Sequence, residues 1–540
     1  MNRFEKDFVI YPEYSDTEDL RNIQGFSRLL KEDLSRALGD VSPSDEIAKT
    51  LERHRIPAAF ISSDYGGLGM CNKDLLAISE ILSIDWSVFL RTQQIHCAAN
   101  IITLYGNEEQ KRKLLPLIAS GQIIPAICLY EGEMELDFDA MKTGVVTVSA
   151  GKEKLSGCKV NVIGASNANL FIVFGCRKLF QGGSTFTCFL VEKNASTEGN
   201  IVVSKKVDCL GLDFVDVSEV EFSDVPLSME NIIDSSSSGR EIALEYLNSS
   251  PIIYGAAVTG FMKRLIEILV KFCNTTVQCN AQLSKKLSVQ KLTTEMALST
   301  FALESMCYYI GGMMDENLVV ITDIENAIIN RFANRVIREA IASTIEIVGL
   351  YSCDRRFDYE KLMRDVLTVL SIQNKDSELL EQISLGTLTA WSNVNARNMS
   401  KWQPGLRGTL NRMFGPEKFA ADLSSPKLIH FIAEHAHPSL ENACRNLEYN
   451  MFRLNSVLGV IVAEYGKKLE NDFAALDHIA NVVEGNLSMI SIISRASRSY
   501  SIGLRNADLE LAWTLMLCSR IATTSKNELE SLNDCESPSF

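Results

Sequence analysis

Two kinds of hydrophobic periodicity alternate along this 540-residue chain. Residues 17–125 place apolar side chains at helical spacing, as in "LRNIQGFSRLLKEDLSRAL" and "NEEQKRKLLPLIASG". From residue 123 to about residue 233, short β-rich runs such as "GVVTVSA" and "FTCFLVEK" are separated by Gly, Asn and Asp. Helical spacing returns at about residues 241–383 and again from residue 424 onward. The pattern predicts helices, a compact β domain, and two further helical blocks.

This pattern divides the chain into five predicted segments, because 540 residues exceed what one ordinary core accommodates. We predict an N-terminal helical domain at 1–122, a middle β domain at 123–238 and a four-helix-bundle domain at 239–388. A basic and aromatic linker follows at 389–423, and residues 424–540 form an extra helical domain with a disordered tail, "SKNELESLNDCESPSF". The predicted fold is mainly α, with a small β-barrel-like middle domain.

The composition argues against several classes of function. A net charge of −15 makes nucleic acid an unfavourable partner, since phosphate binding needs a basic face. The sequence has no run of eighteen apolar residues, so no membrane span is expected. The fourteen cysteines form no C-x-x-C pair, which indicates buried thiols in a reducing compartment such as cytosol or mitochondrial matrix. The acidic N-terminus does not resemble a transit peptide, which we expect to be trimmed or absent.

The segment 382–416 contains neither Asp nor Glu. Its basic and aromatic residues of interest are Arg397, Lys401, Trp402, Arg407, Arg412 and Phe414. Two interpretations stay open for this segment. It is a solvated linker, or it contacts an anionic membrane surface, which basic and aromatic side chains favour.

Further along, "HFIAEHAHPSL" contains His430, His435 and His437. No Cys, Asp or Glu stands at ligand spacing from them to supply the second half of a metal site, so we expect structural roles for these histidines and predict no metal site. Arg495 and Arg498 are three residues apart on one predicted helix face. We expect packing and ion pairs from them, with an inter-domain or partner contact as the alternative.

Several local segments carry a resemblance to a known family. "DYGGLG" (64–69), "GNEEQKRKLLPLIASG" (106–121), "MKRLIE" (262–267) and "YEKLMRD" (359–365) are similar to recurrent segments of the acyl-CoA dehydrogenases. "HPSLENA" (437–443) and "SRASRSYSIGLRNADLE" (494–510) resemble the extra C-terminal helical domain of the family's very-long-chain branch. The resemblance extends from about residue 8 to about residue 520, and it implies the acyl-CoA dehydrogenase fold with that extra domain.

The resemblance also indicates where a catalytic base is expected. In the family a glutamate abstracts the α-proton of an acyl-CoA thioester and FAD accepts the β-hydride. Aligned from the "RD" pair at 364–365, that glutamate falls on Gln373, whose amide has no useful basicity near neutral pH. The alternate base position of some members falls on Ser250, which cannot serve either. Asp376 and Glu378 are nearby acids, but a displaced carboxylate is costly.

The flavin contacts of the family also differ in this sequence. The resemblance places the family's threonine on Tyr130, its serine on Leu136, its tryptophan on Asn161 and its ring-facing hydroxyl on Ile163. It places the pyrophosphate-binding arginine on Thr276, the phenylalanine on Cys279 and two glycines on Leu350 and Ser352. Because several independent contacts are lost together, no cofactor is expected to bind. If the former cleft has collapsed, Tyr130, Leu136 and Leu350 should be buried in it; a cleft filled by a ligand or a partner stays open as well.

These losses predict a protein that is not an enzyme but a catalytically inactive scaffold. The very-long-chain branch includes a core subunit of the mitochondrial complex I assembly complex, whose dimer holds the Ecsit protein. The resemblance therefore implies a homodimer that binds an Ecsit-like assembly factor and other assembly-complex subunits on the matrix side of the inner mitochondrial membrane. Two alternatives stay open: an FAD-dependent long-chain or very-long-chain acyl-CoA dehydrogenase with a remodelled site, and a non-catalytic acyl-CoA binder.

Overall fold

The computed structural model describes residues 6–534 except 15, 41, 133–137, 139, 150–151, 179–183, 195–196, 234–238, 320 and 400–423. The chain forms two compact units, each built from segments distant in sequence. The sheet unit comprises residues 14–269 and 344–373, and the helical unit comprises residues 1–13, 270–343 and 374–540. Helices α8 (Pro251–Thr275) and α10 (Asp323–Val348) contribute residues to both units.

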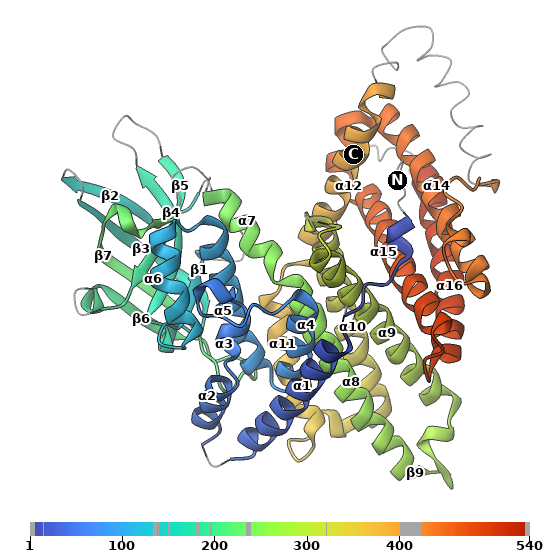
Figure 1. Cartoon of the computed structure of the whole chain (residues 1–540), viewed down its shortest axis with the longest axis horizontal. Coiled ribbons are helices and arrows are strands. Elements are labelled where there is room, and N and C mark those ends of the chain that lie inside the picture. The colour runs from blue at the N-terminus through green and yellow to red at the C-terminus, as the bar shows by residue number, and fades with distance from the viewer. Residues whose placement is uncertain are drawn as a thin grey trace. The chain divides into compact units, whose positions relative to one another are not determined.

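The sheet unit begins with α-helices, and side chains cap the starts of three of them. These helices are α1 (Thr17–Leu38), α2 (Pro43–Arg53), α3 (Ile56–Ala59), α4 (Asn72–Leu82), α5 (Trp86–Tyr105) and α6 (Glu108–Ala119) (Figure 1). Asp16 and Asp85 accept a backbone N–H at the starts of α1 and α5. Asn107 and Gln110 form a reciprocal capping box at the start of α6. The caps fix where each of these three helices begins.

A single eight-stranded sheet follows in the chain. Its strands are β1 (Pro125–Cys128), β2 (Gly144–Ser149), β3 (Lys152–Ile163), β4 (Leu170–Lys178), β5 (Ser184–Glu192), β6 (Ile201–Lys206), β7 (Val217–Leu227) and β8 (Ile232–Ile233). The strand order is β6-β7-β3-β2-β4-β5-β8, and β1 pairs with β4 off this path. β1 and β2 pair parallel to β4, and the other pairs are antiparallel.

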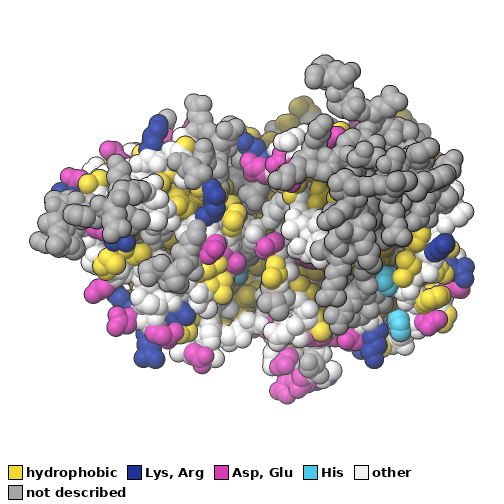
Figure 2. All heavy atoms as spheres, turned by 90° about the horizontal axis from the view of Figure 1, so that it is seen from above, with side chains coloured by type: hydrophobic (Ala, Val, Ile, Leu, Met, Phe, Trp, Pro, Cys, Tyr) yellow, Lys and Arg dark blue, Asp and Glu magenta, His cyan; other side chains and the backbone are white. Residues whose placement is uncertain are grey.

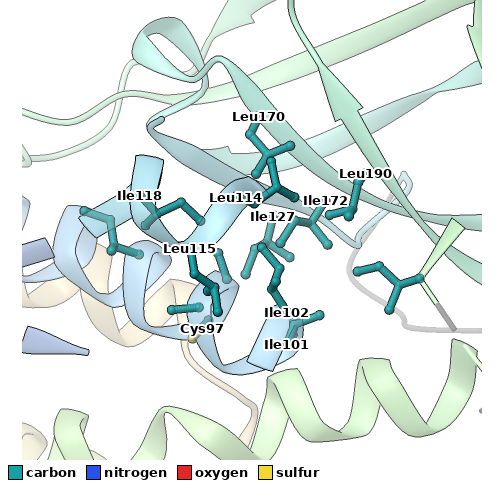
Figure 3. Close-up of a cluster of buried hydrophobic side chains, with 14 of the residues drawn as sticks. Cys97, Ile101, Ile102, Leu114, Leu115, Ile118, Ile127, Leu170, Ile172 and Leu190 are labelled. Atoms are coloured by element: carbon teal, nitrogen blue, oxygen red, sulfur yellow. The ribbon is translucent and has the colours of Figure 1, made fainter. Parts of the chain in front are cut away.

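The two faces of the sheet bury different cores, because successive strand residues point to opposite sides. On one face, Phe171 and Phe189 join a cluster that contains residues of all eight strands, as expected for a curled, barrel-like sheet. On the other face, Ile172 and Leu190 pack against α5, α6 and α7 (Gly239–Ser249). Figure 3 shows this second cluster, in which Ile102 of α5 lies beside Ile127 of β1 and Leu115 of α6 lies near Cys97 of α5.

The helical unit contains the remaining long helices. They are α9 (Leu287–Asp315), α12 (Asp376–Met399), α14 (Glu441–Tyr465), α15 (Phe473–Ser501) and α16 (Ala507–Asp534), together with much of α10. α15 packs against α9, α12, α14 and α16, so it lies at the centre of this unit. A short hairpin of β9 (Val277–Gln278) and β10 (Ala281–Gln282) precedes α9. Helix α11 (Asp358–Ile372) belongs to the sheet unit.

These elements confirm the predicted fold class, mainly α with a β domain and an extra C-terminal helical domain. Two details differ from the sequence prediction. α12 continues through Met399, so residues 389–399 are helical where a linker was expected. α16 continues through Asp534, because Leu529 and Leu532 are buried at helical spacing in the segment predicted as a disordered tail. The five domain boundaries stay predictions, since the two compact units cut across them.

Two observations concern the described surface. On the face shown in Figure 2, basic and acidic side chains are interspersed. Among the described residues, no helix is long and apolar enough to cross a bilayer.

Candidate active site

Gln373, at the predicted base position, directly follows the last turn of α11. Its backbone N–H donates to the carbonyl of Val369 at 3.1 Å, and its side chain is half-buried. It is the last residue of the sheet unit. The structure therefore confirms that a helix ends at this position, as the aligned motif implied, while the residue that ends it carries an amide.

A partly buried cluster of charges holds α11 to the rest of the sheet unit. The Lys361 ammonium lies 2.9 Å from Asp85, 2.8 Å from Asp365 and 3.3 Å from Asp213. Burial lowers the pKa of Lys361, but Asp85 and Asp365 raise it more, so its pKa lies above the usual range. Since Asp85 also caps α5, the cluster links α11 to α5.

The same cluster holds the segment between β6 and β7. Asp365 accepts the Leu212 backbone N–H at 3.1 Å. Gly211 has a φ of +84°, and a Cβ at this position would lie 2.4 Å from the Asp365 carboxylate. Only glycine allows the two backbones to approach so closely. The "RD" part of the family segment thus has a visible structural role.

The two acids near the base position have different surroundings. Asp376, in the first turn of α12, lies 3.6 Å from Arg331 and 3.8 Å from Arg338. Glu378 is 54% exposed, and Lys375 is 3.9 Å away. Two arginines thus engage Asp376, whereas Glu378 is the less constrained carboxylate. Ser250, the alternate base position, lies between α7 and α8, and its carbonyl accepts the Tyr254 N–H at 3.0 Å.

Four of the flavin positions fall in two segments, "LYEGEMELD" (129–137) and "GCKVNVIG" (157–164), which align with flavin-contacting motifs of the family. A buried ion pair that sequence reasoning missed joins these two segments. Lys159 is fully buried, and its Nζ lies 2.7 Å from Oε1 of Glu131. Lys159 also donates to the Leu129 carbonyl at 3.0 Å. The Glu131 carboxylate accepts the backbone N–H groups of Lys142 at 2.6 Å and Thr143 at 2.9 Å. The available signal was that Glu131 and Lys159 keep the glutamate and lysine of the aligned motifs "LYEGEMELD" and "GCKVNVIG".

The ionisation of this pair follows from its surroundings. Burial lowers the pKa of Lys159, and the Glu131 carboxylate only partly offsets this. Burial also acts to raise the pKa of Glu131, but the ammonium and the two backbone donors hold it below its ordinary value of 4.5. The pair fastens the segment after β1 onto β3.

The neighbouring flavin positions have become part of the fold. Tyr130 is half-buried against the cluster between the sheet and α5, α6 and α7. Ile163 is buried, whereas Asn161 is exposed with a φ of +57°. Leu136 lies outside the described residues.

The remaining flavin positions are solvent-facing or locally bonded. Thr276 precedes the β9–β10 hairpin, and Cys279 with Asn280 forms its two-residue turn at φ values of +53° and +61°, as a type I′ turn requires. Leu350 is 83% exposed, so the expectation that it fills a cleft is wrong. Ser352 is buried, and its hydroxyl donates to the Gly349 carbonyl at 2.8 Å. The described side chains therefore do not fit the contacts by which family members hold FAD.

The two arginines and the histidines singled out in the C-terminal domain have structural partners. Arg495 bridges Glu304 at 2.8 Å and Glu510 at 3.2 Å, and Arg498 pairs with Glu13 at 2.5 Å. These are ion pairs, as expected, and those with Glu304 and Glu13 also join segments that the sequence assigned to different domains, as the alternative expected. The His437 ring packs on Tyr500 at 4.6 Å. No metal-binding group of three His, Cys, Asp or Glu side chains occurs in the described part of the chain.

Only one of the linker candidates lies among the described residues. Arg397 lies in α12. Lys401, Trp402, Arg407, Arg412 and Phe414 lie outside the described residues.

Family models match most of these elements. The acyl-CoA dehydrogenase N-terminal domain matches residues 34–122, and the acyl-CoA dehydrogenase C-terminal domain matches residues 237–372. The ACAD9/ACADV C-terminal domain matches residues 438–539. The chain belongs to the acyl-CoA dehydrogenase family, and it carries the extra C-terminal domain of the ACAD9/ACADV type.

Individual relatives agree with this assignment. The chain is 24% identical over 519 residues to the mitochondrial very long-chain specific acyl-CoA dehydrogenase of Rattus norvegicus, covering 92% of this chain and 77% of the relative. It is 25% identical to the Homo sapiens protein of the same name, covering 85% and 70%. An acyl-CoA dehydrogenase from Bacillus anthracis, solved in complex with FAD, has a TM-score of 0.82 at 20% identity and covers 99% of this chain and 91% of its own.

These findings correct two expectations from the sequence. We expected a protein that is not an enzyme, yet these two relatives and this structural neighbour are named as dehydrogenases. We also expected no cofactor, yet the structure that covers almost the whole chain was solved with FAD. The error lay in treating lost side-chain contacts as a lost site, since backbone groups also bind cofactor phosphates.

Proposed function

We propose that this protein is an FAD-dependent acyl-CoA dehydrogenase of the very-long-chain type with a remodelled site. The single observation that supports this most is the match of nearly the entire chain, extra C-terminal domain included, to the fold of an FAD-complexed acyl-CoA dehydrogenase. The internal geometry adds support, because the Glu131–Lys159 pair and the Lys361 cluster preserve the framework around the flavin and base positions.

The remodelled site has to supply a base other than residue 373. α-Proton removal needs a carboxylate or another group of suitable basicity. Glu378 is our candidate, because Asp376 is already engaged by two arginines. The comparison of Glu378→Gln with Asp376→Asn tests this choice. We expect turnover to fall by about 10²–10⁴-fold in the first variant only. Equal losses in both, or a loss confined to Asp376→Asn, would reject Glu378.

The direct test of the proposed function uses the intact purified protein. Its visible absorption spectrum is recorded before and after incubation with FAD, and palmitoyl-CoA oxidation is assayed with an artificial electron acceptor. We expect a flavin spectrum and acceptor reduction that depends on palmitoyl-CoA. A colourless protein after reconstitution would reject the proposal, and so would a flavin that palmitoyl-CoA does not reduce.

A second function is favoured by the C-terminal domain. The ACAD9/ACADV model matches residues 438–539, and the family resemblance implies a role in assembling respiratory complex I through an Ecsit-like factor. We propose this scaffold role in addition to the enzymatic one, with the protein acting as a homodimer on the matrix side of the inner mitochondrial membrane. The named relatives are mitochondrial proteins.

Two measurements test the scaffold role. Purified protein is mixed with recombinant Ecsit, and the complex is sought by size-exclusion chromatography with light scattering, which also reports the dimer. Fractionation of cells that express the tagged chain tests the location. A mixture that elutes as separate components, or a tagged chain absent from mitochondria, would contradict this role.

A further inference from the structure

The residues that precede α1 form a short peptide bound to the helical unit. A single 3-10 turn, η1 (Lys6–Val9), is followed by non-helical backbone to Glu13. We call residues 6–13 the N-terminal strap. Val9 and Pro12 are buried while Ile10 is 59% exposed, so the strap has one buried and one exposed side. η1 contacts α15, and Figure 1 shows its blue ribbon beside that helix.

Helix α9 provides one wall for the strap. The hydroxyl of Tyr309, which is 4% exposed, donates to the Phe8 carbonyl at 2.8 Å. One turn further along α9, Gly312 lies directly under the ring of Pro12. A Cβ at Gly312 would come within 2.3 Å of Pro12 Cγ, far inside van der Waals contact. The glycine therefore lets the proline ring lie against the helix backbone.

Helix α15 provides the other wall through charged groups, and α16 adds a carboxylate to the same network. Arg498 of α15 pairs with Glu13 of the strap at 2.5 Å. Arg495, one turn earlier, joins Glu304 of α9 to Glu510 of α16. Burial raises the pKa of the Tyr11 phenol, with Arg495 opposing and Glu304 adding to the shift, which locates this ring beside the same charges.

We propose that α9, α15 and α16 form a peptide-binding surface whose ligand is an extended apolar–Tyr–Pro–acidic segment, supplied in this chain by its own residues 9–13. The strap meets this surface through side chains and through the Phe8 carbonyl, as a bound peptide does. The strap thereby clamps the extra C-terminal domain, represented by α15 and α16, onto α9.

The test separates binding from covalent attachment in the full chain. A specific protease site is inserted at residue 15, between the strap and α1, and the protein is nicked after folding. We expect the freed strap peptide to stay with the protein through gel filtration. It should then exchange slowly with a fluorescent synthetic peptide of residues 6–14, KDFVIYPEY. A scrambled peptide of the same composition should not compete.

A matched pair of glycine variants controls for folding. Gly312→Ala places a Cβ against Pro12 and should release the strap at least about tenfold faster. Gly459→Ala, in α14, meets only an ordinary contact at 3.8 Å and should leave release unchanged. Circular dichroism verifies that both variants are folded. Immediate loss of the peptide from the unmodified nicked protein would overturn the proposal. Equal release rates in the two variants would also overturn it.

Discussion

The buried Glu131–Lys159 pair allows a quantitative prediction. Glu131→Ala removes the carboxylate and leaves the fully buried Lys159 ammonium with only the Leu129 carbonyl at 3.0 Å and the Met141 sulfur at 3.5 Å. An uncompensated buried charge typically costs about 3–5 kcal/mol. We expect the free energy of unfolding of the sheet unit to fall by that amount.

The partner substitution should cost less, because it leaves fewer groups unsatisfied. Lys159→Met keeps the length of the side chain and removes its charge. The Glu131 carboxylate then retains its two backbone donors at 2.6 and 2.9 Å, while the Leu129 carbonyl and the Met141 sulfur lose the ammonium. The expected loss is roughly 1–3 kcal/mol. The double variant should be more stable than the sum of the single effects predicts, since the residues are in direct contact.

The assay has to report on the sheet unit alone. Trp86, which is 1% exposed, is the only one of the four tryptophans within that unit. Urea unfolding followed by fluorescence in a background with the other three tryptophans replaced by phenylalanine therefore isolates the relevant transition. Single-variant losses below about 0.5 kcal/mol, or strict additivity in the double variant, would refute the reasoning.

The pH dependence gives an independent check on the same pair. The folded-state pKa of Glu131 lies below its ordinary value of 4.5. Its stabilising contribution is therefore complete above that pH and is lost as the pH falls through the lowered pKa. As the pH falls from neutral to below 4.5, the free energy of unfolding should decrease more in the wild type than in Glu131→Gln. Parallel pH profiles for the two proteins would contradict the assigned direction.

Three further predictions concern the base position and the buried charges. In the Glu378→Gln background, Gln373→Glu restores a carboxylate where the family has its base, so palmitoyl-CoA turnover should recover by about 10²–10⁴-fold, whereas Gln373→Asn in the same background should change nothing. An unaltered rate in the glutamate variant would show that residue 373 does not face the substrate. Arg331→Met removes a 9%-exposed guanidinium that contacts Asp477 at 3.0 Å, and should lower the free energy of unfolding in urea melts by about 2–4 kcal/mol. The matched Arg338→Met, whose wild-type side chain is 50% exposed, should cost less than about 1 kcal/mol, and equal losses in the two variants would contradict this. Lys361→Met should increase hydrogen exchange in α11 and lower the free energy of unfolding by roughly 2–3 kcal/mol, a value reduced because the ammonium is partly exposed. Unchanged exchange would show that the cluster does not hold the helix.

The sequence was informative where a property depends on local spacing. The change from helical to strand periodicity near residue 123 agrees with α6 ending at Ala119 and β1 beginning at Pro125. The "RD" pair indicated the helix that ends immediately before Gln373. Local signals were less useful in the predicted linker at 389–423 and in the predicted tail, where apolar residues at helical spacing are sparse. There α12 nevertheless continues to Met399 and α16 to Asp534.

The motif comparison gave the identity of each side chain but not its surroundings. Tyr130 and Leu350 are both large residues at former flavin positions. Tyr130 is half-buried in a core cluster while Leu350 is 83% exposed, because burial depends on which distant elements cover a residue. The inference from lost contacts to a lost cofactor failed for the same reason, since a binding site includes backbone groups that no side-chain motif records.

The sequence by itself determined the order of helices and strands, the family and the amide at residue 373, because these follow from local periodicity and residue identity. Only the tertiary structure decided that Glu131 pairs with Lys159 at 2.7 Å and that Pro12 lies on Gly312. The latter residues are 300 positions apart in the chain. Such contacts depend on how complete elements pack against each other, and hydrophobic spacing within one element carries no information about its distant partner.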